Sequence, residues 1–79
     1  MNEQEIAKRL SARELACLQY LAQHGESDAE HYAAVLGRLA ILGLVEAVPV
    51  LALPVLPPRH HYRITARGRA VLHTARQPH

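Results

Sequence analysis

The residues with the greatest capacity for chemistry gather in the last quarter of this 79-residue chain. Residues 59–79 carry five arginines, four histidines and no acidic residue, whereas residues 1–58 carry four basic and seven acidic residues. A polyanion would therefore meet the C-terminal part of the protein. The candidate DNA contacts are Arg38, Arg59, His60, His61, Arg63, Arg67 and Arg69. The alternative is a solvated basic face that only balances the acidic part of the chain.

Metal and nucleophile chemistry are disfavoured by the spacing of the histidines and the single thiol. His60 and His61 are adjacent, so in a strand they point to opposite faces, and the one cysteine cannot form a Cys-x-x-Cys pair. Cys17 lies within a predicted helix beside Leu18, which favours a buried, inert thiol. The four glycines are isolated and form no phosphate loop. We therefore expect no metal and no cofactor.

Length and composition limit the protein to one small domain. With 79 residues, of which 49% are apolar and 20% charged, the chain can form a single modest core, and a catalytic cavity would compete with it. A non-enzymatic binding or regulatory role is therefore expected, in one domain spanning residues 1–79. The first ten residues are charged, and the apolar stretch from residue 39 to 56 is interrupted by a glutamate, a glycine and prolines. These features predict a cytoplasmic protein without a membrane span.

Two capping-box patterns predict the first helices. Ser11 to Glu14 has the spacing in which each side chain bonds the backbone of the other residue, and it predicts a helix over about residues 12–24 that ends at Gly25. The same pattern from Ser27 to Glu30 predicts a second helix over about residues 28–42. Residues 3–9 are good helix formers and can add a short N-terminal helix.

A proline-rich β-hairpin and a final helix complete the expected order. Residues 44–53 are rich in β-branched side chains and contain a proline, which favours an edge strand, and residues 61–65 alternate as a returning strand does. Thr65 is expected to cap a helix over about residues 66–76, whose inward residues would be Ala70, Val71, Leu72 and Ala75. The order helix, helix, hairpin, helix defines an α+β domain.

Two segments resemble the winged helix-turn-helix regulators of the MarR and PadR types over about residues 11–76. The first is Leu39-x-x-Leu42-Gly43-Leu44-Val45-Glu46 before the hairpin, and the second is Tyr62-Arg63-Ile64-Thr65-Ala66-Arg67-Gly68-Arg69 leading into the last helix. The resemblance implies a small winged-helix-like fold and a transcription regulator that binds double-stranded DNA as a homodimer. Only residues 26–42 fill the interval in which these regulators place two helices, so the positioning helix is expected to be shortened or missing.

Apolar residues at positions expected to face solvent indicate a second possible function, the binding of another protein. On the second helix the outward face is smooth and offers few hydrogen-bonding groups, and the hairpin loop is almost wholly apolar. The candidate interface residues are Ala34, Gly37, Ile41, Val50, Leu51, Leu53 and Leu56. Strand alternation leaves open that about half of the hairpin residues cover the protein's own core. In this alternative the chain is an inhibitor or adaptor that no longer reads DNA sequence.

Overall fold

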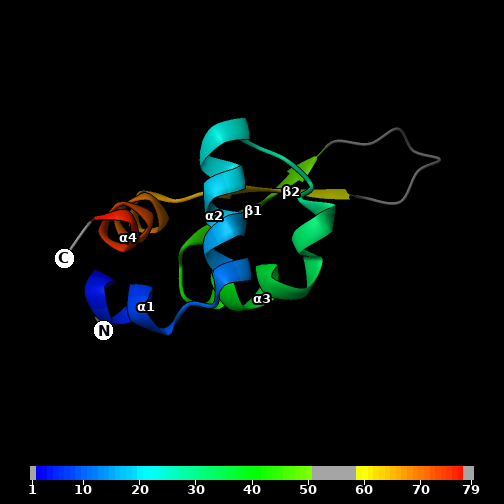
Figure 1. Ribbon diagram of the computed structural model, residues 1–79. Helices are drawn as coiled ribbons and strands as arrows, with labels where there is room; N and C mark the ends of the chain where they lie inside the picture. Colours follow the sequence, from blue (N-terminus) through cyan, green and yellow to red (C-terminus); the bar gives the residue numbers. More distant parts are fainter. Residues whose placement is uncertain (1, 51–58, 78–79) are drawn as a thin grey trace.

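The order of the elements follows the caps and turns along the chain (Figure 1). The computed structural model describes residues 2–50 and 59–77. These residues form the helices α1 (Glu3–Arg9), α2 (Ala12–His24), α3 (Ala33–Ile41) and α4 (Ala66–Arg76), the 3-10 turn η1 (Glu30–Tyr32), and the antiparallel strands β1 (Val45–Val50) and β2 (Arg59–Ile64). The predicted α+β class is confirmed, in a layout compatible with a winged-helix-like fold.

Side-chain caps start α2 and α4 where the sequence predicts them. The Ser11 hydroxyl accepts a hydrogen bond from the Glu14 N–H at 3.1 Å, and the Glu14 carboxylate accepts one from the Ser11 N–H at 2.8 Å. The Thr65 hydroxyl accepts from the Gly68 N–H at 3.0 Å. Gly25 ends α2 with a φ of 73°. The predicted bounds of α2 and α4 are confirmed, and so is the short N-terminal helix α1.

The predicted second capping box is wrong, and α3 begins at Ala33 rather than near residue 28. The Ser27 N–H donates to the carbonyl of Tyr62 at 3.1 Å, and the Ser27 carbonyl accepts from the Tyr62 N–H at 2.7 Å. Ser27 is therefore extended and bridged to β2. Ala29 follows with a φ of 47°, in the left-handed region, so no helix can run through this segment.

The turn η1 is held by side chains of α2. The Arg13 guanidinium donates to the carbonyl of His31 and lies over the ring of Tyr32, 5.5 Å from its centroid. The Tyr32 ring also packs against that of Tyr20, with 5.7 Å between centroids. A single turn fixed by α2 thus occupies the interval in which a shortened positioning helix is expected, and it sets where α3 starts.

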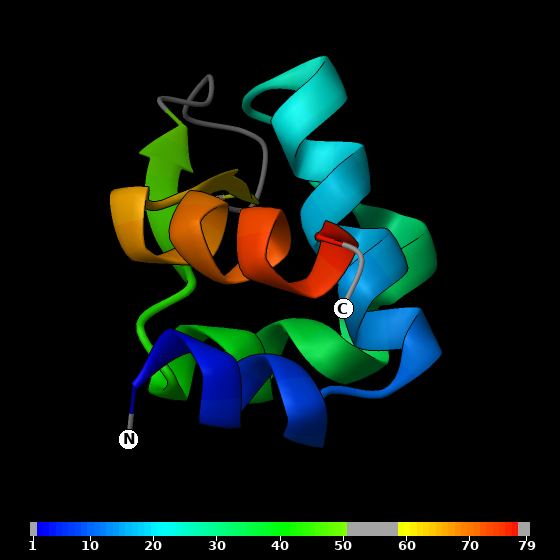
Figure 2. The ribbon, with the colours of Figure 1, turned by 60° about the vertical axis from the view of Figure 1, so that its left-hand side comes forward.

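The hydrophobic core lies between the helices and the base of the hairpin. α1 packs alongside α4 (Figure 2), and α2 contacts α3, α4 and β2. In the hairpin Val45 pairs with Ile64, and both are buried. On α4 the predicted inward positions Val71 and Leu72 are buried, whereas Ala70 is exposed, so that part of the prediction is wrong. Within the described residues no helix is long and apolar enough to cross a bilayer.

Two glycines make the junction between α3, β1 and α4 possible. Gly43 has a φ of 78°, which turns the chain from α3 into β1. Gly68 is buried against the start of β1: a Cβ atom placed on it would lie 2.1 Å from the carbonyl oxygen of Leu44. That oxygen accepts a hydrogen bond from the Thr65 N–H at 3.0 Å. Only a glycine at this position allows α4 to approach β1 so closely.

Candidate functional site

α3 presents an apolar face to solvent. Its buried side consists of Leu36 and Leu39, which belong to the core. Its opposite side is exposed, and we call it the apolar α3 face: Ala33, Ala34, Gly37, Ala40 and Ile41. Ile41 is 87% exposed and is the one large hydrophobic residue found exposed in the described part of the chain. The three helix residues predicted as a protein interface, Ala34, Gly37 and Ile41, therefore lie on one surface.

Gly37 lies in the middle of this face and has no packing role among the residues that the structure describes. A Cβ atom placed on it would have nothing within 4 Å. A glycine in a helix interior costs about 0.5–1 kcal/mol relative to alanine. The described structure therefore contains no contact that compensates for this cost.

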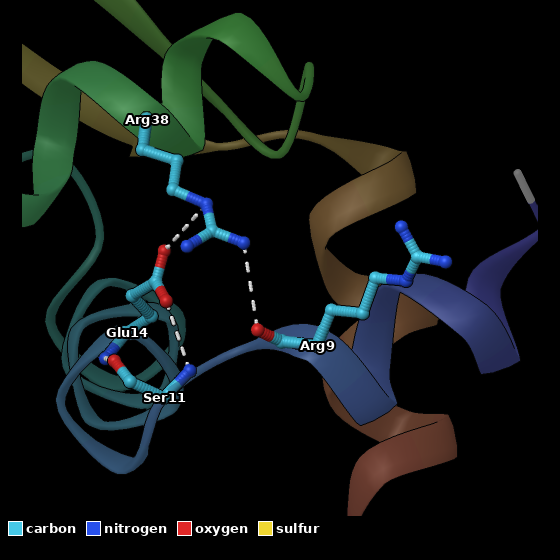
Figure 3. A network of polar contacts seen from close by, with 4 residues as sticks. All are labelled: Arg9, Ser11, Glu14 and Arg38. Atoms are coloured by element: carbon cyan, nitrogen blue, oxygen red, sulfur yellow. Dashed lines mark hydrogen bonds and ion pairs between the residues drawn. The ribbon is translucent and has the colours of Figure 1, made fainter.

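Arg38, the single basic residue of α3, is held by an intramolecular network (Figure 3). Its Nε lies 3.4 Å from Oε2 of Glu14, and its Nη2 donates to the carbonyl of Arg9 at 3.4 Å. Glu14 is only 3% exposed, and its Oε1 is the acceptor of the Ser11 capping bond. Oε2 has no hydrogen-bond donor among the described residues, so the Arg38 charge is what compensates it.

This network fixes α3 relative to the junction of α1 and α2. The Arg38 side chain is 56% exposed, so the pair lies at the edge of the core, with the carboxylate inside and the guanidinium outside. A base edge would compete with two existing partners for the guanidinium. Arg38, one of the predicted DNA contacts, therefore already has two partners, and these contacts fix the position of α3.

Two basic residues of β2, Arg63 and His61, also lie against carboxylates. Arg63 forms an ion pair through its Nε with Glu46, its cross-strand neighbour on β1. The Nδ1 of His61 lies 3.3 Å from Oε1 of Glu26. Together with Arg38, three of the seven predicted DNA contacts therefore face acids from residues 1–58. This pattern is the one expected of a basic face that balances the acidic part of the chain.

The other predicted site residues are spread over different parts of the fold. His60 is exposed, Arg67 lies beside Gly43 and has a partner within its own chain, and Arg69 is exposed on α4. β2 leads into α4 at Ile64, so its first residues lie at the end of the strand that is far from α4 (Figure 1). Arg59 and Val50 are placed in the strands, but their side chains, and residues Leu51, Leu53 and Leu56 entirely, are outside the described residues.

Two shallow depressions flank these surfaces and differ in charge. The depression between α3 and β2, of about 390 Å³, is lined by Asp28, Glu30, Ala33, Leu36, His60 and Tyr62. The depression between α2 and α4, of about 260 Å³, is lined by Ala22, Arg69, Leu72, His73 and Arg76. The fold places the acids Asp28 and Glu30 against the hairpin residues His60 and Tyr62.

Cys17 is not placed for chemistry. It is fully buried in the core, and this burial raises the pKa of its thiol to about 11, although the charge of Arg13 acts in the opposite direction. The predicted buried thiol is confirmed. In the part of the chain that the structure describes, no three His, Cys, Asp or Glu side chains are grouped so that they could hold a metal ion.

Comparison of the chain with protein-family models, with curated proteins and with solved structures found no match.

Proposed function

We propose that this chain is a winged-helix-like protein-interaction module in which α3 contacts a partner protein instead of reading DNA. The order α2, η1, α3 and then the β1–β2 hairpin supports the winged-helix-like description. The observation that carries the proposal is the apolar α3 face, because it occupies the position at which such regulators carry their base-reading side chains.

The chemistry of α3 supports this choice. Specific readout of base edges uses Arg, Lys, Asn or Gln side chains. α3 contains only Arg38 of these types, and Arg38 already forms an ion pair with Glu14 and donates to the carbonyl of Arg9. A helix with small apolar side chains instead allows a partner to approach closely and bury the exposed Ile41.

The electrostatics beside α3 act against a phosphate backbone. Asp28 and Glu30 line the depression between α3 and β2, where a phosphate backbone would pass. On the hairpin itself, Arg63 and His61 would have to leave Glu46 and Glu26 before they could contact phosphate. The cost of each exchange is small at exposed positions, but none of these groups supplies an unopposed charge.

The test compares variants of the apolar α3 face with a matched change elsewhere. Ile41→Glu places a charge on the face, and Ala70→Glu places one at an exposed position of α4. Cross-linked partner proteins captured by the parent and by Ala70→Glu should be lost from Ile41→Glu. The parent should show no retention on duplex DNA at ~50 mM salt, where several phosphate contacts would still bind strongly. Unchanged capture by Ile41→Glu would refute the proposal.

Sequence-independent DNA binding is a second candidate, favoured by the basic depression on α4. Arg69, His73 and Arg76 line it, and no acidic residue is among its described lining residues. If DNA binds here, each of the changes Arg69→Gln and Arg76→Gln should lower the slope of log K against log salt by about one unit. Arg38→Gln should leave that slope unchanged.

A further inference from the structure

We propose that the partner on the apolar α3 face is a second copy of this chain, packed with its α3 antiparallel to the first about a twofold axis at Gly37. This inference rests on the proposed function, because it names the protein that α3 contacts. Its basis is the shape of the face, the position of Gly37 within it, and the charges at the two ends of α3.

The shape of the face is complementary to itself. At 100° per residue, Ala34 and Ile41 lie on one side of Gly37, and Ala33 and Ala40 lie on the other. A twofold axis at Gly37 therefore brings Ile41 of one copy opposite Ala34 of the other, and Ala33 opposite Ala40. The large Ile41 thus meets the small Ala34, and the Ala33–Ala40 pair is small on both sides, so the two helices can approach closely without a clash at Ile41.

Gly37 then acquires a role that it lacks in the single chain. At the crossing point of two helices a residue without a Cβ lets the backbones approach closely. Among the described residues of one copy, a Cβ at Gly37 would have no neighbour within 4 Å. The second helix would occupy this space, and its contacts would compensate for the helix-weakening glycine.

The charges at the ends of α3 are opposite and suit an antiparallel pair. Asp28 and Glu30 are exposed before the N-terminal end of α3, and Arg67 lies beside Gly43, just after its C-terminal end. In the antiparallel arrangement the acidic end of one copy lies next to the Arg67 end of the other. The two helix dipoles are also opposed, which favours this orientation over the parallel one.

The expected dimer is weak. A contact made by one helix from each copy buries an area at the low end of specific interfaces, below ~1,200 Å² in total, which is typical of transient association. Dissociation in the micromolar range or above is therefore expected, and sedimentation velocity should be measured from about 5 to 500 µM. The parent should change from monomer to dimer across this range.

The first variant pair tests whether Gly37 lies at the contact. Gly37→Leu adds a strong helix former where a single copy has open space, so each copy should fold at least as well as the parent. The added side chain should separate the helices and raise the dissociation constant at least tenfold. Ala70→Leu, an equal change on the exposed side of α4, should dimerise as the parent does.

Disulfide trapping tests the register. An Ala33→Cys variant mixed with an Ala40→Cys variant should cross-link under mild oxidation, because these positions face each other in the antiparallel pair. Each variant alone should not, since two copies of one position lie farther apart than the ~7 Å limit for a disulfide. The native Cys17 is buried with a raised pKa and should not interfere. An Ala70→Cys variant controls for random collision.

The outcomes separate this inference from the proposed function. Three results would each overturn the second copy as the partner on α3. The parent could stay monomeric, the Gly37→Leu variant could still dimerise as the parent does, or disulfides could form equally at all tested cysteine positions. If Ile41→Glu nevertheless loses a captured foreign protein, the interaction module stands with a different partner. If Ile41→Glu changes neither self-association nor capture, both proposals fail.

Discussion

Replacing Gly68 by alanine should destabilise the protein although alanine is the better helix former. Gly68 lies in the first turn of α4, where the helix crosses the start of β1. The new Cβ would lie 2.1 Å from the Leu44 carbonyl oxygen and 2.7 Å from Cγ1 of Ile64. The first of these is a backbone atom in the core and cannot rotate away, so α4 or β1 must shift.

The magnitude follows from opposing effects of similar size. Alanine gains about 1 kcal/mol in helix propensity over glycine. Overpacking of a core typically costs about 1–3 kcal/mol, and a shift that breaks the bond from the Thr65 N–H to the Leu44 carbonyl adds roughly another 0.5–1.5 kcal/mol. The packing cost exceeds the gain, and we expect a net loss of about 1–3 kcal/mol, or roughly 5–15 °C in Tm for a domain of this size.

Gly37→Ala provides the matched control, because Gly37 is also inside a helix but has open space at its Cβ position. Urea and thermal unfolding followed by circular dichroism at about 5 µM, where a weak dimer is dissociated, would give both stabilities. Gly37→Ala should raise stability by about 0.5–1 kcal/mol. A Gly68→Ala protein as stable as the parent would refute the reasoning, since it would mean that α4 and β1 can move apart without a loss of stability.

Three further changes test the polar and buried groups, each by urea unfolding. Arg38→Ala should cost about 1–2 kcal/mol more than Arg69→Ala, because it leaves the buried Glu14 carboxylate without its cation, although solvent at the exposed guanidinium reduces the effect. Since burial raises the pKa of Cys17 to about 11 from 9.0, the parent should lose on the order of 2 kcal/mol between pH 9 and 11, as the unfolded thiol deprotonates first, and Cys17→Ala should lack this slope. Glu46→Ala should change stability by no more than about 1 kcal/mol, because it removes an exposed ion pair.

The helices predicted correctly are those whose signals lie within a few residues of their ends. The Ser11 capping box, the Thr65 cap and the Gly25 stop satisfy backbone groups of their own helix, so their effect does not depend on the rest of the fold. The outward face of α3 was equally predictable, because helical periodicity alone places Ala34, Gly37 and Ile41 opposite the buried leucines.

The prediction failed where a distant segment competes for the same backbone. Ser27 and Glu30 have the spacing of a capping box, yet the backbone of Ser27 pairs with Tyr62, thirty-five positions along the chain. A capping box needs the Ser27 N–H for the Glu30 carboxylate, but the Tyr62 carbonyl accepts it instead, and the left-handed Ala29 interrupts the helical run that the box would start. Arg13 completes the change by holding η1 through His31 and Tyr32.

The amino-acid sequence by itself determined the α+β class, the bounds of α1, α2 and α4, and which residues of α3 would be apolar and exposed, because these depend on periodicity and on local caps. Only the tertiary structure decided where α3 begins and which arginines are occupied. Arg38 with Glu14 and Arg63 with Glu46 are separated by 24 and 17 positions, so their pairing depends on how helices and strands pack. The charged residues counted along a sequence give the net charge of the protein, but the fold determines which of them are paired within the chain and which can contact a partner.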